Sequence, residues 1–254
     1  MIEPQYFAFQ WGKVAYYLQG EGHTLVFLHG WGQDFSTFNN LIKRLPNNFQ
    51  VLGIDLPGFG NSSIVKDALS IKEYSEVINK ILNKLLITHP TIIAHSFGGR
   101  IAFRYGSNNS VKRLILISPA GIKHRTLKYY LKVYKYKFLK RFYKIFSKKR
   151  YNELVKNSGS SDYQKADWIM RNVLVKAVNY NSIKDMRQIK CPVYLFWGIF
   201  DIETPYSDGL KMIKVISNSK IFPFYNSGHF SYIQEEDQVF QKLLSLIIED
   251  AIWK

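Results

Sequence analysis

The chain has 254 residues, a hydrophobic share of 46% and a formal net charge of +16 at pH 7. This length and composition favour one large α/β domain, with or without an insertion, and exclude wholesale disorder. No apolar run could span a bilayer, no secretory leader is visible and Cys191 is the single cysteine, so we expect a cytoplasmic protein without disulfide, metal or other cofactor.

Apolar strand-like runs alternate with helical patterns along most of the chain. An opening hairpin is expected over residues 6–18, and the further strands are expected at residues 24–28, 50–54, 91–94, 111–118, 192–198 and 220–224. The helices between them include one that Ser36 would cap and Pro46 would stop, and one that Ser70 would cap. This alternation predicts a mostly parallel, doubly wound α/β sheet, in which function collects at the carboxyl ends of the strands.

The hydrophobic pattern of the sequence changes after residue 121. Residues 122–187 lack buried-strand runs and have helical patterns instead. We therefore expect a helical cap, or lid, at 122–187, inserted into a core made of residues 1–121 and 188–254.

A serine is expected on a tight turn between the strand at 91–94 and the next helix. In the run Ala94-His95-Ser96-Phe97-Gly98, small residues lie two positions before and two positions after Ser96. A strained strand-to-helix turn that projects a nucleophilic hydroxyl requires such small residues. The alternative is an ordinary turn in which Ser96 only caps the helix.

A serine nucleophile needs a base, and the base needs an acid that orients it. Of the six histidines, His229 directly follows the last strand and lies at the correct end of the sheet; the five that position disfavours are His23, His29, His89, His95 and His124. Asp201 follows the preceding strand and is the expected acid, with Glu203 as the fallback; a turn or helix-capping role is the alternative for both. The order Ser96, Asp201, His229 is the one that this kind of sheet imposes.

Negative charge that develops on the carbonyl oxygen needs aligned donors. We expect these to be the backbone N–H groups of Phe97, directly after the serine, and of Trp31, in the loop after the strand at 24–28. Separate loops thus satisfy the requirements of one reaction.

The chain resembles the α/β-hydrolase superfamily over nearly its whole length. The matching motifs are Leu28-His29-Gly30-Trp31-Gly32, Asp55-Leu56-Pro57-Gly58-Phe59-Gly60-Asn61-Ser62, Ala94-His95-Ser96-Phe97-Gly98-Gly99, Trp197-Gly198-Ile199-Phe200-Asp201 and Ser227-Gly228-His229-Phe230. The resemblance implies a nucleophile at Ser96, an acid at Asp201, a base at His229, oxyanion donors at Trp31 and Phe97, and a helical cap. Residues 55–60 look like the structural loop of the family.

Ser96 disfavours the branches of this superfamily that use aspartate as nucleophile. His95 and Phe230 depart from the usual pattern of the hydrolases that cleave carbon–carbon bonds, whereas cofactor-free haloperoxidases share the triad and stay open. The chain is most similar to carboxylic-ester hydrolases.

The expected cap contains a basic amphipathic segment. Apolar residues recur at steps of three and four between residues 127 and 145, interleaved with lysines and arginines and interrupted near Ser147. The favoured interpretation is an apolar stripe that roofs the acyl pocket while the lysines are solvated. The alternative is a docking face for an acidic partner, either an acyl carrier protein or an anionic membrane surface; a nucleic acid is disfavoured because no groove-reading module is visible.

The sequence therefore predicts a cytoplasmic serine hydrolase acting on a small or medium carboxylic ester. A pimeloyl-carrier-protein methyl ester esterase, or another hydrolase of carrier-bound acyl groups, is the specific alternative. An alternative from another class is a catalytically silent binding protein that docks through its basic lid.

Overall fold

The computed structural model describes residues 3–10, 12–64, 67–123, 127–156 and 159–248. Its centre is one eight-stranded sheet in the order β1-β2-β4-β3-β5-β6-β7-β8. The strands are β1 (Gln5–Phe9), β2 (Gly12–Gln19), β3 (His23–Leu28), β4 (Phe49–Ile54), β5 (Thr91–His95), β6 (Arg113–Ile117), β7 (Val193–Gly198) and β8 (Ser219–Phe224). From β4 to β8 neighbouring strands are parallel, while β1 and β2 form the antiparallel hairpin at one edge. The predicted mostly parallel α/β sheet is confirmed.

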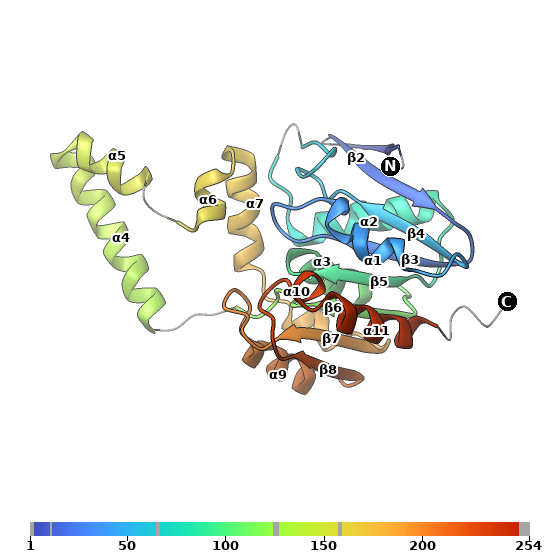
Figure 1. Cartoon of the computed structure of the whole chain (residues 1–254). Coiled ribbons are helices and arrows are strands. Elements are labelled where there is room, and N and C mark those ends of the chain that lie inside the picture. The colour runs from blue at the N-terminus through green and yellow to red at the C-terminus, as the bar shows by residue number, and fades with distance from the viewer. Residues whose placement is uncertain (1–2, 11, 65–66, 124–126, 157–158, 249–254) are drawn as a thin grey trace.

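Helices cover both faces of this sheet (Figure 1). The helices of the described chain are the 3₁₀ helix η1 (Phe35–Phe38), α1 (Asn39–Lys43), α2 (Ile71–Lys84), α3 (Phe97–Gly106), α4 (Leu127–Phe146), α5 (Lys148–Lys156), α6 (Ser161–Lys165), α7 (Trp168–Asn179), α8 (Ile183–Met186), α9 (Tyr206–Val215), α10 (Ser231–Gln234) and α11 (Glu236–Ile247). No helix in the described ranges combines the length and the apolarity needed to cross a membrane.

The sheet has a hydrophobic core on each face because successive side chains of a strand point to opposite sides. In β3, Val26 and Leu28 join a core with α2, α3, α7 and α9, whereas Leu25 and Phe27 join a second core with η1, α1 and α11. Because both faces are covered, these strands are apolar without alternation, which is why the sequence shows them as continuous apolar runs.

Two helix starts test the capping predictions. Ser70 caps α2 as predicted: its hydroxyl accepts from the Glu73 N–H, and the Glu73 carboxylate accepts from the Ser70 N–H. The prediction for Ser36 is wrong. Asp34 is the N-cap instead, because its carboxylate accepts from the Ser36 N–H and starts the 3₁₀ turn η1; α1 then ends at Lys43, before Pro46.

The region between β6 and β7 is helical where the structure describes it. The predicted interruption near Ser147 separates α4 from α5. Figure 1 shows α4 and α5 standing apart from the sheet, with α6 and α7 between them and the core. The division into a core and a cap at 122–187 stays a prediction.

Candidate active site

Ser96 lies on the turn between β5 and α3 and has an unusual backbone. Its φ of 47° and ψ of −108° lie in a region that residues with a side chain avoid. Hydrogen bonds hold this turn: the Ser96 N–H donates to the carbonyl of Ile117 at 3.1 Å, and the Ser96 carbonyl accepts from the Ala120 N–H at 2.9 Å. The Ser96 side chain makes no cap hydrogen bond to α3, so the alternative of a mere helix cap is wrong.

Gly98, two positions after Ser96, lies against backbone atoms that leave no room for a side chain. A Cβ atom on Gly98 would collide with the carbonyl oxygens of Leu28 and His29, at the end of β3. The Gly98 N–H also donates to the His29 carbonyl at 3.1 Å. The serine turn is therefore pressed against the loop after β3 by backbone contact.

Asp201 and His229 lie in contact although 28 residues separate them. His229 Nδ1 is 2.9 Å from Asp201 Oδ2, and both side chains are buried. Thr204 donates to both carboxylate oxygens of Asp201, from its N–H to Oδ1 at 2.9 Å and from its hydroxyl to Oδ2 at 2.8 Å. Burial alone would raise the pKa of Asp201, but the hydrogen bonds from His229 and Thr204 outweigh it and hold that pKa below its ordinary value. The carboxylate stays ionised beside the imidazole.

Glu203, the fallback acid, reaches the other ring nitrogen of His229. Its Oε2 is 3.4 Å from Nε2, and its side chain is mostly exposed. Among the hydrogen bonds of the described residues, none joins Ser96 Oγ to this imidazole. The structure thus separates the two acids: Asp201 is the buried partner of Nδ1, and Glu203 is a solvent-facing partner of Nε2.

His95 and Gln33 form a network that the sequence did not point to. His95 Nε2 lies 3.0 Å from the carbonyl oxygen of His229, and Nδ1 lies 3.0 Å from Gln33 Oε1. Gln33 Oε1 also accepts from the Gly30 N–H at 3.0 Å, while its amide group donates to Thr37 and Tyr232. Burial above all, and the nearby charge of His229, lower the pKa of His95 to about 3, so its ring is neutral near pH 7 and its one N–H donates to only one of these two oxygens. This network connects the serine turn, the His229 loop and the loop after β3.

The backbone N–H groups of Trp31 and Phe97 are the two expected oxyanion donors. Within the described part of the chain, neither the Trp31 N–H nor the Phe97 N–H donates a hydrogen bond. Their side chains pack edge to face, with ring centroids 5.4 Å apart. Phe97 opens α3, whose first N–H groups have no partner within the helix.

The motif at 55–60 has a structural arrangement. Asp55 accepts from the N–H groups of Phe35 and Asn61, each at 2.8 Å. His29 Nδ1 donates to the Gly30 carbonyl at 2.7 Å and Nε2 accepts from the Leu56 N–H at 2.8 Å; burial lowers the pKa of His29, in keeping with this neutral form. Together they connect the loops after β3 and β4.

Two of the remaining histidines lie away from the site. His23 begins β3 and bonds to Thr91 at the start of β5, and His89 precedes β5. Both are at the amino ends of strands, opposite Ser96, as expected. His124 lies outside the described residues.

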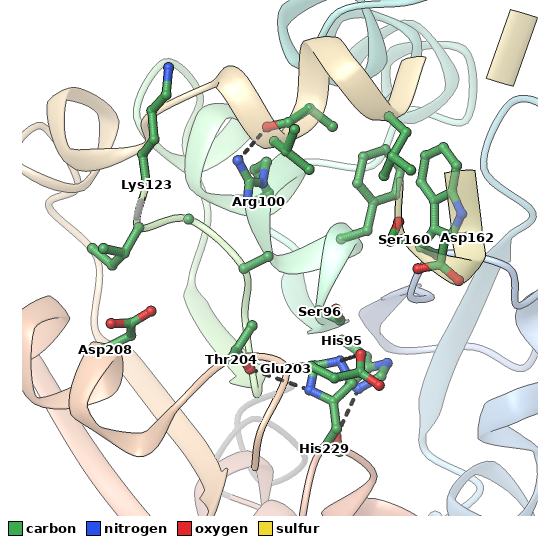
Figure 2. A pocket seen from close by; sticks show the side chains of 18 of the residues that line it. His95, Ser96, Arg100, Lys123, Ser160, Asp162, Glu203, Thr204, Asp208 and His229 are labelled. Atoms are coloured by element: carbon green, nitrogen blue, oxygen red, sulfur yellow. Dashed lines mark hydrogen bonds and ion pairs between the residues drawn. The ribbon is translucent and has the colours of Figure 1, made fainter. Parts of the chain in front are cut away.

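A cavity of about 600 Å³ opens above Ser96 and His229 (Figure 2). Trp31, Phe97 and Glu203 line it near the serine, and the part of its wall that comes from the region between β6 and β7 consists of Ala120, Gly121, Ile122, Lys123, Ser160, Ser161, Asp162, Leu174, Ala177, Val178 and Asn179. No described residue of α4 or α5 lines it, so the expected roofing by the basic segment is wrong for the part that the structure describes.

Arg100 attaches the cavity wall to the serine helix. Its buried guanidinium donates to the carbonyls of Ala177 and, at 2.6 Å, Tyr180, at the end of α7. Burial lowers the pKa of Arg100 to about 10, which leaves it charged near pH 7. Among the described residues, no group of three or more His, Cys, Asp or Glu could hold a metal ion.

Comparison with known proteins now identifies the family. The sequence model of the alpha/beta hydrolase fold matches residues 23–161, more than half of the chain. The chain belongs to the alpha/beta hydrolase fold family. The AB hydrolase superfamily protein YisY from Bacillus subtilis (strain 168) is 24% identical over 245 residues, which cover 87% of this chain and 90% of that protein. A serine hydrolase-like protein from Danio rerio is 30% identical over 117 residues, 44% of this chain and 36% of that protein.

Solved structures of this alpha/beta hydrolase fold superpose over nearly the whole chain. An esterase from Exiguobacterium antarcticum has a TM-score of 0.72 and 21% identity, covering 93% of this chain and 96% of that one. An alpha/beta hydrolase enzyme from a deep-sea metagenome library has a TM-score of 0.74 and 19% identity, covering 95% and 96% of the two chains. The predicted fold class is confirmed.

Proposed function

We propose that this alpha/beta hydrolase is a serine hydrolase of carboxylic esters, with Ser96 as nucleophile, His229 as general base and Asp201 as the acid that orients it. The observation that carries the proposal is the 2.9 Å contact between His229 Nδ1 and Asp201 Oδ2, in the cavity that also contains the strained turn of Ser96. Asp201 holds the Nδ1 proton in place, so that Nε2 presents a lone pair to a hydroxyl.

In this mechanism, Ser96 Oγ attacks the ester carbonyl carbon while its proton passes to His229 Nε2. The N–H groups of Trp31 and Phe97 stabilise the oxyanion, and donors of this kind each contribute about 3–4 kcal/mol to the transition state. Collapse breaks the bond to the alkoxy group, which takes the proton from His229 and leaves as the alcohol. Water, deprotonated by His229, then attacks the acyl-enzyme; the bond to Ser96 Oγ breaks, Ser96 takes the proton back from His229, and the acid is released.

The position of Glu203 adds one condition to this mechanism. Its carboxylate lies 3.4 Å from the nitrogen that must accept the serine proton. Because the Glu203 side chain is mostly exposed, it can rotate into solvent when a substrate enters. A bound ester displaces it and leaves Nε2 to Ser96.

The names of similar proteins support the proposal. A similar protein from Danio rerio is called serine hydrolase-like, and a similar structure from Exiguobacterium antarcticum is an esterase. The strained turn of Ser96 and its place in the wall of the cavity support its role as nucleophile. In this proposal, residues 122–187 form the cap, and α6, α7 and the chain segments beside them supply its wall of the acyl cavity.

Turnover of short p-nitrophenyl esters tests the proposed chemistry. We expect Ser96→Ala to abolish this turnover, because alanine lacks the hydroxyl group that attacks the ester. A Ser107→Ala variant, changed at the far end of α3, is the matched control and should retain the wild-type rate. Equal rates for wild type and Ser96→Ala would contradict the assignment.

Covalent labelling separates an enzyme from a catalytically silent binding protein. A fluorophosphonate should label the wild-type chain at Ser96, located by peptide mass spectrometry, and should leave Ser96→Ala unlabelled. A wild-type chain that stays unlabelled would favour the binding protein.

A further inference from the structure

The helices α4 and α5 form a hairpin that stands apart from the rest of the molecule (Figure 1). We call residues 127–156 the basic hairpin. It contains eleven lysines and arginines and one acid, Glu153, so it carries ten of the sixteen net positive charges of the chain. Its two helices contact each other where they join, near Ser147.

One side of α4 is covered within the hairpin. Val133, Tyr136, Leu139 and Tyr143 are half-buried on this side, and the guanidinium of Arg150, from α5, lies over the Tyr143 ring at 5.8 Å. These positions recur at steps of three and four and therefore share one helical face. Near the end of α4, this half-buried face contacts α5.

The opposite side of α4 is apolar and exposed. It consists of Leu131, Tyr134, Phe138, Phe142 and Ile145, which also recur at steps of three and four. Tyr134 is 70% exposed, Phe138 69% and Ile145 72%. The rings of Phe138 and Phe142 stack on each other, with centroids 6.3 Å apart, and not on the core. The face runs over roughly 20 Å at 1.5 Å per residue.

Exposed cations flank this face on both sides. On a helical projection Lys135 lies beside one edge and Arg141 beside the other. An apolar strip between two basic margins is the pattern of a helix that lies in a lipid interface, with its apolar side chains below the headgroups and its cations at their level.

We propose that the basic hairpin docks this protein on an anionic lipid surface through the exposed face of α4. Anionic headgroups match the surplus of ten positive charges, and the acyl region covers the apolar strip. A second copy of the chain fits poorly, because two such hairpins would repel each other. An acidic protein would match the charge, but the charge alone does not call for an exposed strip of five large apolar side chains.

Both ends of the hairpin connect to the wall of the cavity. The chain leaves the cavity wall at Lys123 and returns to it at Ser160, and the hairpin lies between these two points. A hairpin bound to a membrane would therefore tether the wall of this cavity to that membrane.

Vesicle co-sedimentation of the full chain tests the docking. We expect binding to vesicles that contain phosphatidylglycerol, weakening as salt rises, and little binding to pure phosphatidylcholine. Binding is measured without turnover, so the result does not depend on the proposed esterase activity.

Two variants separate the apolar from the charged contribution. We expect Phe138→Ser/Phe142→Ser, and separately Lys135→Gln/Arg141→Gln, to weaken binding to anionic vesicles roughly tenfold or more. The first control is Tyr225→Ser, which changes an exposed aromatic side chain outside the hairpin. The second is Lys80→Gln/Lys184→Gln, which removes the same charge from other surfaces. Both controls should bind like the wild type, and circular dichroism should show unchanged helix content in all four variants.

Three results would overturn the proposal. The first is no binding of the wild type to anionic vesicles at low salt. The second is vesicle binding that Phe138→Ser/Phe142→Ser leaves unchanged, which would mean simple adsorption of a basic protein. The third is a dimer in analytical ultracentrifugation, or a complex with an acidic carrier protein, that Phe138→Ser/Phe142→Ser abolishes. In that case the same variant would leave vesicle binding unchanged.

Discussion

At the scale of single residues, the Asp201 carboxylate is the most completely satisfied group of the site. It accepts hydrogen bonds from Glu203, Thr204 and His229, and its side chain is buried. The sequence suggested a turn role or a catalytic role for Asp201 as alternatives. The structure shows the turn contacts and the histidine contact together, because one carboxylate has lone pairs enough for both.

The lowered pKa of Asp201 predicts a pH dependence of stability. A carboxyl group whose folded pKa lies below its unfolded value stabilises the fold above the unfolded pKa, near 3.8, and loses that contribution as pH falls through the folded pKa. We expect Asp201→Asn to be less stable than the wild type at pH 7, with the difference shrinking as pH falls below about 4. Urea unfolding across this range measures it; a difference independent of pH would contradict the expectation.

Gln33 is a positioning residue in the same network. Its side chain connects the Gly30 N–H, in the loop of the Trp31 donor, to His95, which bonds to the His229 backbone. We expect Gln33→Leu to lower kcat on p-nitrophenyl esters roughly ten- to hundredfold with little change in KM, because small displacements of catalytic groups are costly.

A conservative variant distinguishes positioning by Gln33 from general packing. Gln33→Glu keeps an acceptor for the Gly30 N–H but loses the donors to Thr37 and Tyr232, and should restore part of kcat. The neutral state of His95 near pH 7 means that its own titration should not appear in the pH–rate profile between pH 5 and 8. Equal losses for the Leu and Glu variants would show that the Oε1 contacts do not matter.

At the scale of elements, the junction of β3 with α3 decides how the site is assembled. Gly98 allows α3 to approach the carbonyls at the end of β3, and Ser96 is held in its strained turn beside them. The strained backbone of Ser96 is held by its hydrogen bonds to Ile117, the last residue of β6, and to Ala120, just after β6.

Two glycines of α3 give a matched pair of substitutions. Gly98→Ala should destabilise the fold by about 1–3 kcal/mol, since its Cβ meets backbone oxygens that cannot move aside. Gly106→Ala should stay within roughly 1 kcal/mol of the wild type, because its Cβ meets the flexible Leu114 side chain at 3.1 Å and alanine favours the helix. Urea unfolding of both variants measures this; similar values would show that the close approach at Gly98 is unimportant.

At the scale of the whole molecule, the stabilising contacts are unevenly distributed. The sheet and the helices on its two faces form two continuous cores, whereas no described residue of α4 or α5 belongs to either core. A helix pair with few buried side chains opens at a small cost in free energy.

Limited proteolysis should reveal this difference. We expect the first cuts by trypsin, and separately by chymotrypsin, to fall within residues 127–156, which contain both lysines and exposed aromatic side chains. Using two enzymes excludes the trivial effect of lysine content. Mass spectrometry of the early fragments locates the cuts, and first cuts within β3 to β6 would contradict the expectation.

The sequence by itself determined the sheet, the serine turn and the order of Ser96, Asp201 and His229. These are local features: buried strands leave apolar runs, a tight turn demands small residues, and parallel strands bring the residues that follow them to one edge. Only the tertiary structure decided which nitrogen of His229 faces each acid, that Gln33 and His95 connect three loops, and that the apolar strip of α4 faces outward. Apolar periodicity shows that a helix has an apolar face, but what covers that face depends on segments far away in the chain.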